Sequence, residues 1–121
     1  MGFRTGIIYN QMVVDELSDT EVNRLFHALA DATRRDIVVR TITDEQSVSA
    51  LAAHYSMSFA AVQKHVAVLE RAALVSKEKR GREQIVRGNH EGLQKARRLL
   101  DEYEAIWRQR VDQIEGILAE G

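Results

Sequence analysis

The chain has 121 residues, enough for one domain with a single core, and an ordinary content of apolar (45%) and charged (29%) residues. It contains no cysteine, which excludes disulfides, thiolate metal sites and thiol redox sensing. No apolar run approaches the roughly 18 residues of a membrane-spanning helix, and the N-terminus lacks a secretory signal pattern. We therefore expect a cytoplasmic protein without a membrane partner.

The net charge of −1 is unevenly distributed along the chain. Residues 1–57 carry five basic and eight acidic side chains, a balance of −3. Residues 58–90 carry seven basic against three acidic, a balance of +4, and residues 91–121 carry five against seven, a balance of −2. Local field rather than total charge governs attraction to phosphate. Segment 58–90 is therefore the part expected to face a nucleic acid.

The N-terminal part of the chain is predicted to contain an arm and two helices. Residues 1–17 are assigned to the arm, in which Met12 is an alternative start that the sequence does not decide. Ser18-Asp19-Thr20-Glu21 forms a capping box and opens a helix, and Asp31 caps a second helix that runs to about Ile42. Asp44-Glu45-Gln46 indicates a connecting loop. The apolar residues assigned to these helices are Val22, Leu25, Phe26 and Leu29, then Ile37, Val38 and Ile42.

The middle of the chain combines two short helices with a basic hairpin. Ser47 caps the first helix, Ser56 and Met57 lie in the turn, and Ser58 caps the second helix, from Phe59 to about Ala72. Core positions in these helices are Val48, Leu51, Ala52, Val62, Val66 and Leu69. Two strands, 74–79 and 83–87, follow and turn at Arg80-Gly81-Arg82. The predicted fold is mainly α with a small β-hairpin wing, a winged helix-turn-helix DNA-binding domain over residues 18–90.

The last segment, from about Glu91 to Glu120, is predicted to be one long helix within the same domain (residues 91–121). A helix of about 30 residues would be roughly 45 Å long, longer than a domain this small requires. We therefore expect its apolar stripe to pair two subunits in a homodimer, although packing on its own domain could use part of it. The expected interface residues are Leu93, Leu100, Tyr103, Trp107, Val111, Ile114 and Leu118.

Residues 25–87 contain a series of short motifs. They are Leu29-Ala30-Asp31-Ala32-Thr33-Arg34-Arg35, Leu51-Ala52, Met57-Ser58, Val62-Gln63-Lys64-His65-Val66, Leu69-Glu70-Arg71-Ala72-Ala73-Leu74-Val75 and Gly81. In content and in order, this series resembles the ArsR-type (ArsR/SmtB) bacterial transcriptional repressors. The resemblance implies a homodimeric repressor that binds double-stranded DNA at a pseudo-palindromic operator.

The departures from the family are equally informative. Ala32 stands where the family often has Pro, Ala73 where Gly usually ends the recognition helix, and Gln63 where Ser is frequent. The cysteine motif of arsenic and cadmium sensors is missing around Leu51, and so is the Asp/His pattern that zinc sensors carry on the last helix. We therefore expect no metal and no cofactor. The segment from Tyr103 to Glu115 is similar to a metal-free branch whose members dimerise through their terminal helices.

Residues at the start of the predicted recognition helix are the candidates for base contacts. Gln63 can pair with adenine N6 and N7, and Lys64 can reach guanine O6/N7 or a phosphate. The alternative is an ordinary amphipathic helix with solvated polar residues. His65 is either a packed, hydrogen-bonded residue or a phosphate contact. The candidate contacts in this helix are Ser58, Phe59, Ala60, Ala61, Gln63, Lys64 and His65.

The wing is the second candidate contact. Gly81 permits the turn, and arginines suit phosphates and narrow grooves; a merely solvated charge run is the alternative. The candidate residues are Lys77, Lys79, Arg80 and Arg82.

The sequence gives little support for catalysis. The four histidines are scattered without a metal-ligand partner at helical spacing, and the chain has no Gly-rich phosphate loop or serine nucleophile motif. Two further hypotheses stay open. The winged fold could bind a protein instead of DNA, or a small-molecule effector could bind between terminal helices near Tyr103 and Trp107.

Overall fold

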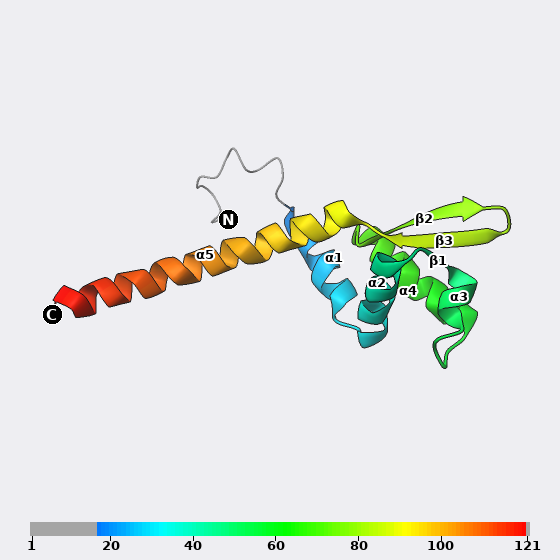
Figure 1. The fold of residues 1–121 in the computed structure, drawn as a ribbon, viewed down its shortest axis with the longest axis horizontal. Helices are drawn as coiled ribbons and strands as arrows, with labels where there is room; N and C mark the ends of the chain where they lie inside the picture. Colours follow the sequence, from blue (N-terminus) through cyan, green and yellow to red (C-terminus); the bar gives the residue numbers. More distant parts are fainter. Residues whose placement is uncertain (1–16, 121) are drawn as a thin grey trace. The chain divides into compact units, whose positions relative to one another are not determined.

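The computed structural model describes residues 17–120 (Figure 1). The chain divides into two compact units, Leu17–Leu93 and a second unit that holds the helix from Gln94 onward. The predicted arm, except for Leu17, and the alternative start at Met12 lie outside the described residues.

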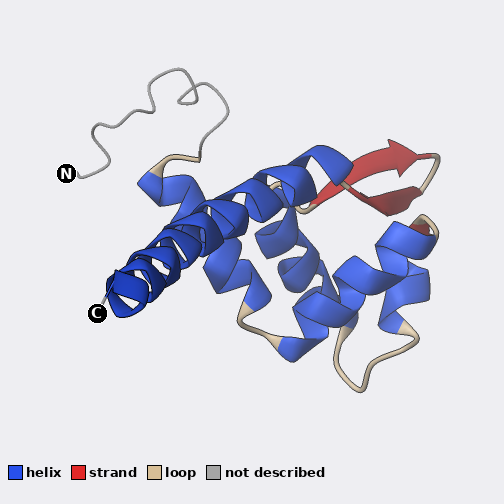
Figure 2. Ribbon diagram, turned by 60° about the vertical axis from the view of Figure 1, so that its left-hand side comes forward, coloured by secondary structure: helices blue, strands red, loops and turns tan. Residues whose placement is uncertain are grey.

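The elements confirm the predicted fold class, mostly helical with one small antiparallel sheet (Figure 2). None of the helices over residues 17–120 is long and apolar enough to cross a membrane. In chain order the elements are α1 (Asp19–Leu29), α2 (Ala32–Thr43), β1 (Gln46–Ser47), α3 (Val48–Ala52), α4 (Phe59–Arg71), β2 (Val75–Arg80), β3 (Glu83–Gly88) and α5 (His90–Glu120).

Polar side chains begin the first four helices, as predicted. Ser18, Asp31, Ser47 and Ser58 each accept a hydrogen bond from the backbone N–H three residues later. At Ser18 the capping box is complete, because its own N–H donates to the Glu21 carboxylate at 2.8 Å. The N–H of Arg34 holds the pKa of Asp31 below its ordinary value. A chain without proline thus starts its helices by side-chain capping.

The core of the first unit forms around α4, which contacts α1, α2, α3 and β2. Val62, Val66 and Leu69, predicted to face the core, are fully buried. Two of the residues assigned to the apolar faces of α1 and α2 are instead exposed: Phe26 is 43% and Ile42 55% exposed. Val22 and Leu29 are half-buried. On α1 the buried pair is instead Leu25 and Ala28, three residues apart.

The sheet corrects two boundaries. Its order is β1-β3-β2, and Gln46, predicted to lie in a loop, pairs with Val86 in β1. A two-residue strand has no periodicity of its own and is defined only by its partner. The wing turn is Gly81-Arg82, because Arg80 still pairs with Glu83. Gly81 has φ +66°, a left-handed conformation that glycine adopts freely.

The end of α4 has a Schellman motif with alanine in the position that usually needs glycine. The N–H groups of Ala73 and Leu74 donate to the carbonyls of Glu70 and Leu69, each at 3.0 Å, and Ala73 has φ +62°. Gly92 lies against this turn, since a Cβ there would overlap the Ala73 carbonyl oxygen. The close approach therefore requires glycine at position 92. Position 73, in contrast, has an alanine whose left-handed backbone conformation is unfavourable for a residue with a Cβ.

A polar cluster ties the helix-turn-helix turn to α2. The Tyr55 hydroxyl donates to Asp36 Oδ2 at 2.6 Å, and Arg40 Nε donates to the same oxygen at 2.7 Å. Burial, together with the Asp36 hydrogen bond, raises the pKa of Tyr55 to about 12. The Tyr55 hydrogen bond and then that of Arg40 lower the pKa of Asp36. The turn that precedes α4 is therefore attached to a second helix.

Replacing Ala73 by glycine is expected to stabilise the protein. The left-handed conformation costs an L-residue about 1–2 kcal/mol, part of which the extra freedom of unfolded glycine offsets. We expect Ala73→Gly to raise the free energy of unfolding by about 1 kcal/mol in urea denaturation. Ala53→Gly is the matched control: this exposed residue follows α3 with φ −66°, so glycine should destabilise there. Equal effects at both positions would contradict the argument.

Tyr55→Phe is expected to lower the free energy of unfolding by about 1 kcal/mol at neutral pH. The folded pKa of Tyr55 lies above its ordinary value, so this contribution is complete below pH 10 and is lost as pH rises through about 12. The difference in unfolding free energy between wild type and variant should therefore shrink across pH 10–12. A difference independent of pH in that window would show that the hydroxyl does not stabilise the turn.

Candidate nucleic-acid interface

The predicted recognition helix, α4, presents a polar face opposite its core residues. Phe59, Ala60, Gln63 and Lys64 are exposed, whereas Val62 and Val66 on the other side are fully buried. Ala61 is half-buried at the boundary between the two faces. Its backbone N–H is satisfied by Ser58 Oγ at 3.1 Å, which fixes the start of the helix. Gln63 and Lys64 therefore lie on the exposed face of a capped helix. Neither side chain forms a hydrogen bond or an ion pair within residues 17–120.

His65 lies beside this face and is hydrogen-bonded. Arg34 Nη1 lies 3.2 Å from His65 Nδ1. A guanidinium has no acceptor, so Nδ1 accepts and a neutral ring carries its proton on Nε2. The structure thus shows the hydrogen-bonded alternative for His65, and a phosphate contact through Nε2 stays a prediction.

Arg34 also caps the C-terminal end of α1. Its Nε donates to the Ala28 carbonyl at 2.9 Å and its Nη2 to the His27 carbonyl at 2.8 Å. Arg35 adds a bond to the Leu29 carbonyl at 2.7 Å. Carbonyls at a helix C-terminus lack helical partners and favour a cation. Arg34 therefore links the end of α1, the start of α2 and the middle of α4.

The register of the wing separates its charges onto two faces, because cross-strand partners lie on the same face. Lys77 pairs with buried Val86, and Lys79 pairs with Gln84. These residues share the face of β2 that begins with buried Val75. The opposite face carries Glu78 and Arg80, with their partners Ile85 and Glu83. Lys77 lies 3.7 Å from Glu70 on α4, so the first face is directed toward α4.

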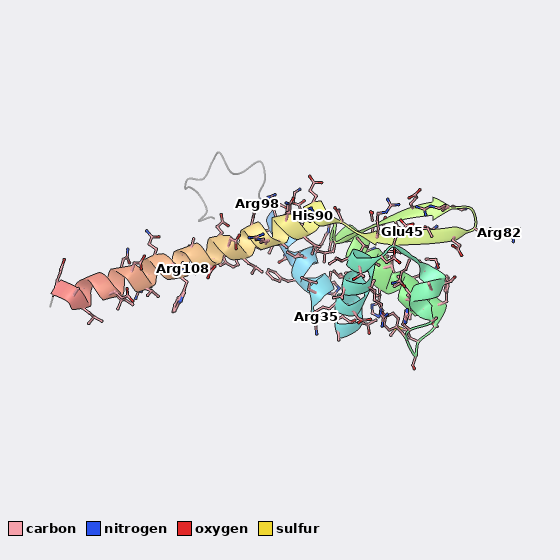
Figure 3. All side chains as sticks on the ribbon, in the orientation of Figure 1. Arg35, Glu45, Arg82, His90, Arg98 and Arg108 are labelled. Carbon is pink, nitrogen blue, oxygen red and sulfur yellow. The ribbon has the colours of Figure 1, made fainter. Side chains whose placement is uncertain are left out.

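The second face holds an ion-pair network that the sequence analysis missed. Arg80 contacts Glu45 at 2.7 Å and Glu78 at 3.1 Å, and Arg87 contacts Glu78 at 2.6 Å and Glu45 at 3.4 Å. Hydrogen bonds from Arg80 to Glu45 and from Arg87 to Glu78 lower the pKa of both carboxyls. Figure 3 shows Glu45 beside the hairpin. The network ties the loop before β1 to the wing.

The candidate cations of the wing therefore differ in their surroundings. Arg80 is paired twice, and Lys77 lies 3.7 Å from Glu70 on α4. Lys79 and Arg82 form no ion pair with any residue of the described range 17–120, and Arg82 lies at the hairpin tip (Figure 3). Lys79 and Arg82 thus have charges available for a nucleic acid. No sequence signal distinguished them from Arg80, because Glu45 is distant in the chain.

The C-terminal part of α5 carries large apolar side chains in water. Trp107 is 66% and Leu118 72% exposed, and most of the predicted interface residues are likewise exposed, while Leu93 and Val111 are half-buried. Isolated exposed apolar residues are common, but a contiguous stripe marks an interaction surface. Among the described residues no group of three or more His, Cys, Asp or Glu side chains could hold a metal ion.

No protein-family model matches the sequence, and no curated protein matches it. Solved structures do match. An ArsR-like transcriptional regulator from Rhodococcus sp. RHA1 is 33% identical, with a TM-score of 0.75, over 84% of this chain and 94% of that one. A possible transcriptional regulator for arsenical resistance is 35% identical, with a TM-score of 0.61, over 74% and 94% of the two chains.

A more distant neighbour is the homodimeric winged helix-turn-helix DNA-binding domain of a possible ArsR-family regulator from Mycobacterium bovis. It is 22% identical, with a TM-score of 0.57, over 87% of this chain and 91% of that chain. It bears on the fold alone. The matches to the Rhodococcus regulator and the possible arsenical-resistance regulator each cover 94% of the matched chain and at least 74% of this one. The chain therefore belongs to the ArsR family of transcriptional regulators.

Proposed function

We propose that this protein is a homodimeric transcriptional repressor that binds a pseudo-palindromic DNA operator. α4 enters the major groove of each half-site, and the wing contacts the flanking backbone. Two-fold symmetry of the protein then requires two half-sites about one helical turn apart. Repression follows from occupation of the promoter, most simply that of its own gene. The protein acts in the cytoplasm, where such DNA is found.

The observation that carries the proposal is the position of unpaired polar and basic side chains on two neighbouring rigid elements. Gln63 and Lys64 lie on the exposed face of capped α4, and Lys79 and Arg82 on the wing form no ion pair within residues 17–120. α4 contacts β2, so the two elements act as one surface. Gln63 and Lys64 would select bases, and the wing would bind phosphates.

The exposed stripe of α5 supports the dimer. A monomer would leave Leu100, Tyr103, Trp107 and Leu118 in water, each at least half exposed. The Mycobacterium bovis neighbour is described as homodimeric, which is consistent with a dimer here. We assign Leu93, Val111 and Ile114 to the same interface.

The composition restricts the signals that the protein can sense. Without cysteine the protein has no thiolate for arsenic or other soft metals. A small-molecule effector between terminal helices would lie near Tyr103 and Trp107, where binding would change the fluorescence of the single tryptophan. The matched relatives are regulators and not enzymes, and we propose no reaction.

Gln63→Ala is expected to weaken binding to operator DNA by about 1–3 kcal/mol for each half-site and to relax sequence preference at one position in each half-site. The operator would first be recovered by selecting bound fragments from genomic DNA. Affinities for operator and random duplexes are then compared by anisotropy titration. Gln109→Ala, an exposed residue on α5, is the control and should change neither affinity. Equal losses on operator and random DNA would remove Gln63 from base recognition.

Lys79→Ala and Arg82→Ala are each expected to weaken binding to all duplexes alike and to reduce the slope of log affinity against log salt by about two, because each substitution removes one phosphate contact from each subunit of the dimer. Arg98→Ala removes the same charge from the polar side of α5 and should leave the slope unchanged. Arg80→Ala is expected to disturb the wing through loss of the Glu45 and Glu78 contacts. Failure of the wild type to retain any duplex at low salt would favour a protein-binding role for the winged fold.

A further inference from the structure

Phe59 places an aromatic side chain at the start of α4, beside the candidate base contacts. It is the first residue of the helix, and 47% of its surface is exposed. Gln63 lies four residues after Phe59 and three after Ala60, spacings at which helical side chains are neighbours. Among residues 17–120 the ring of Phe59 has no aromatic partner. The exposed part of this ring is therefore available to a ligand.

The start of α4 does not need an aromatic residue for its own stability. Ser58 Oγ accepts a hydrogen bond from the N–H of Ala61, which caps the helix. The apolar pair that commonly fixes the entry of the chain into a helix consists of the residue before the cap and the fourth helical residue. Here these residues are Met57, which is half-buried, and Val62, which is fully buried. The exposed part of Phe59 thus serves neither the cap nor the core.

Single exposed apolar residues are common on protein surfaces, and its position distinguishes Phe59 from the others. The other large apolar residues exposed in the unit Leu17–Leu93 are Phe26 on α1 and Val39 and Ile42 on α2. Phe59 belongs instead to the helix whose first residues reach base edges in a helix-turn-helix complex. Because side chains lean toward the N-terminus of a helix, its ring extends from the end of α4 that approaches the bases.

The major groove of B-DNA offers a phenylalanine ring one apolar group, the C5-methyl group of thymine. The other groups that distinguish the base pairs there are hydrogen-bond donors and acceptors. A phenylalanine ring can neither donate to them nor accept from them in the usual way, so covering them would leave polar atoms without partners. Against the thymine methyl group, the ring and the methyl both lose apolar surface to water. Thymine is therefore the base that the side chain of Phe59 fits.

We propose that Phe59 selects a thymine in each half-site of the operator by contact with its C5-methyl group. The proposal rests on the DNA-binding function proposed above and adds a residue that determines specificity. Phe59 and Gln63 are one helical turn apart, about 5–6 Å, and successive base pairs are about 3.4 Å apart. The thymine then lies at most about two base pairs from the adenine that Gln63 would read.

Uracil in place of thymine tests this contact without any change in the protein, because uracil lacks only the methyl group. In the operator recovered by fragment selection, each symmetric pair of thymines is replaced in turn by uracil, and the duplexes are titrated by anisotropy. We expect one such pair to weaken wild-type binding about fifteenfold, about fourfold for each methyl group lost. Phe59→Ala should bind the thymine and uracil duplexes equally at that position.

Phe26→Ala is the matched control, because it removes the same side chain at a similar exposure of 43% from α1. Whatever its overall affinity, this variant should keep the wild-type ratio of thymine to uracil binding. A uracil effect that persists in Phe59→Ala would assign the methyl group to another residue and overturn the proposal. Specific operator binding without any effect of uracil would overturn it and leave the proposed function intact. No preference for any genomic fragment over random DNA would contradict the proposed function and the thymine contact together.

A methyl group on a different base provides a second test. Cytosine methylated at C5 carries its methyl group at the same point of the major groove as thymine. At the position identified with uracil, 5-methylcytosine·guanine pairs should bind the wild type more tightly than cytosine·guanine pairs, by about the factor that uracil removed. Phe59→Ala should not distinguish these two duplexes. Equal binding of both duplexes by the wild type would show that Phe59 does not contact the methyl group.

Discussion

The structure depends on a single constraint on α4. The apolar side of this helix must be covered by neighbouring elements, while its other side must remain exposed to solvent. Val62, Val66 and Leu69 have no exposed surface, and they require neighbours from α1, α2, α3 and β2. Each neighbour is itself too short to bury an apolar face alone. The exposed side of α4, with Gln63 and Lys64, is therefore held in place by a core that the other helices complete.

Polar interactions then fix the angles at which those neighbours meet α4. Arg34 binds the last carbonyls of α1 and His65 on α4, and Asp36 on α2 binds Tyr55 in the turn before α4. Glu45 and Glu78 tie the wing to the loop before β1. These contacts are partly exposed and individually modest in energy. Together these contacts fix the orientation of the elements around α4. A surface that must match a DNA duplex requires this fixed orientation more than it requires additional stability.

The surface formed by α4 and the wing differs in polarity and charge from the stripe of α5. The α4 face and the wing are polar and basic in a segment with a balance of +4, which suits a polyanion. The stripe of α5 is apolar, which suits another helix of the same kind. Because the net charge of the whole chain is only −1, such a division is invisible in the composition and becomes clear only along the sequence.

The sequence by itself determined what is local. The caps at Ser18, Asp31, Ser47 and Ser58, the buried line of α4 and the long apolar stripe follow from spacing and residue type, and the structure shows each of them. Only the tertiary structure decided what depends on residues distant in the chain. The tertiary structure places Gln46 in a strand and leaves Phe26 exposed. It also pairs His65 with Arg34 through a hydrogen bond and Arg80 with Glu45 through an ion pair. The physical reason is that a helix or cap is set by neighbours within one turn, whereas a strand partner, an ion pair or a buried face requires the assembled core.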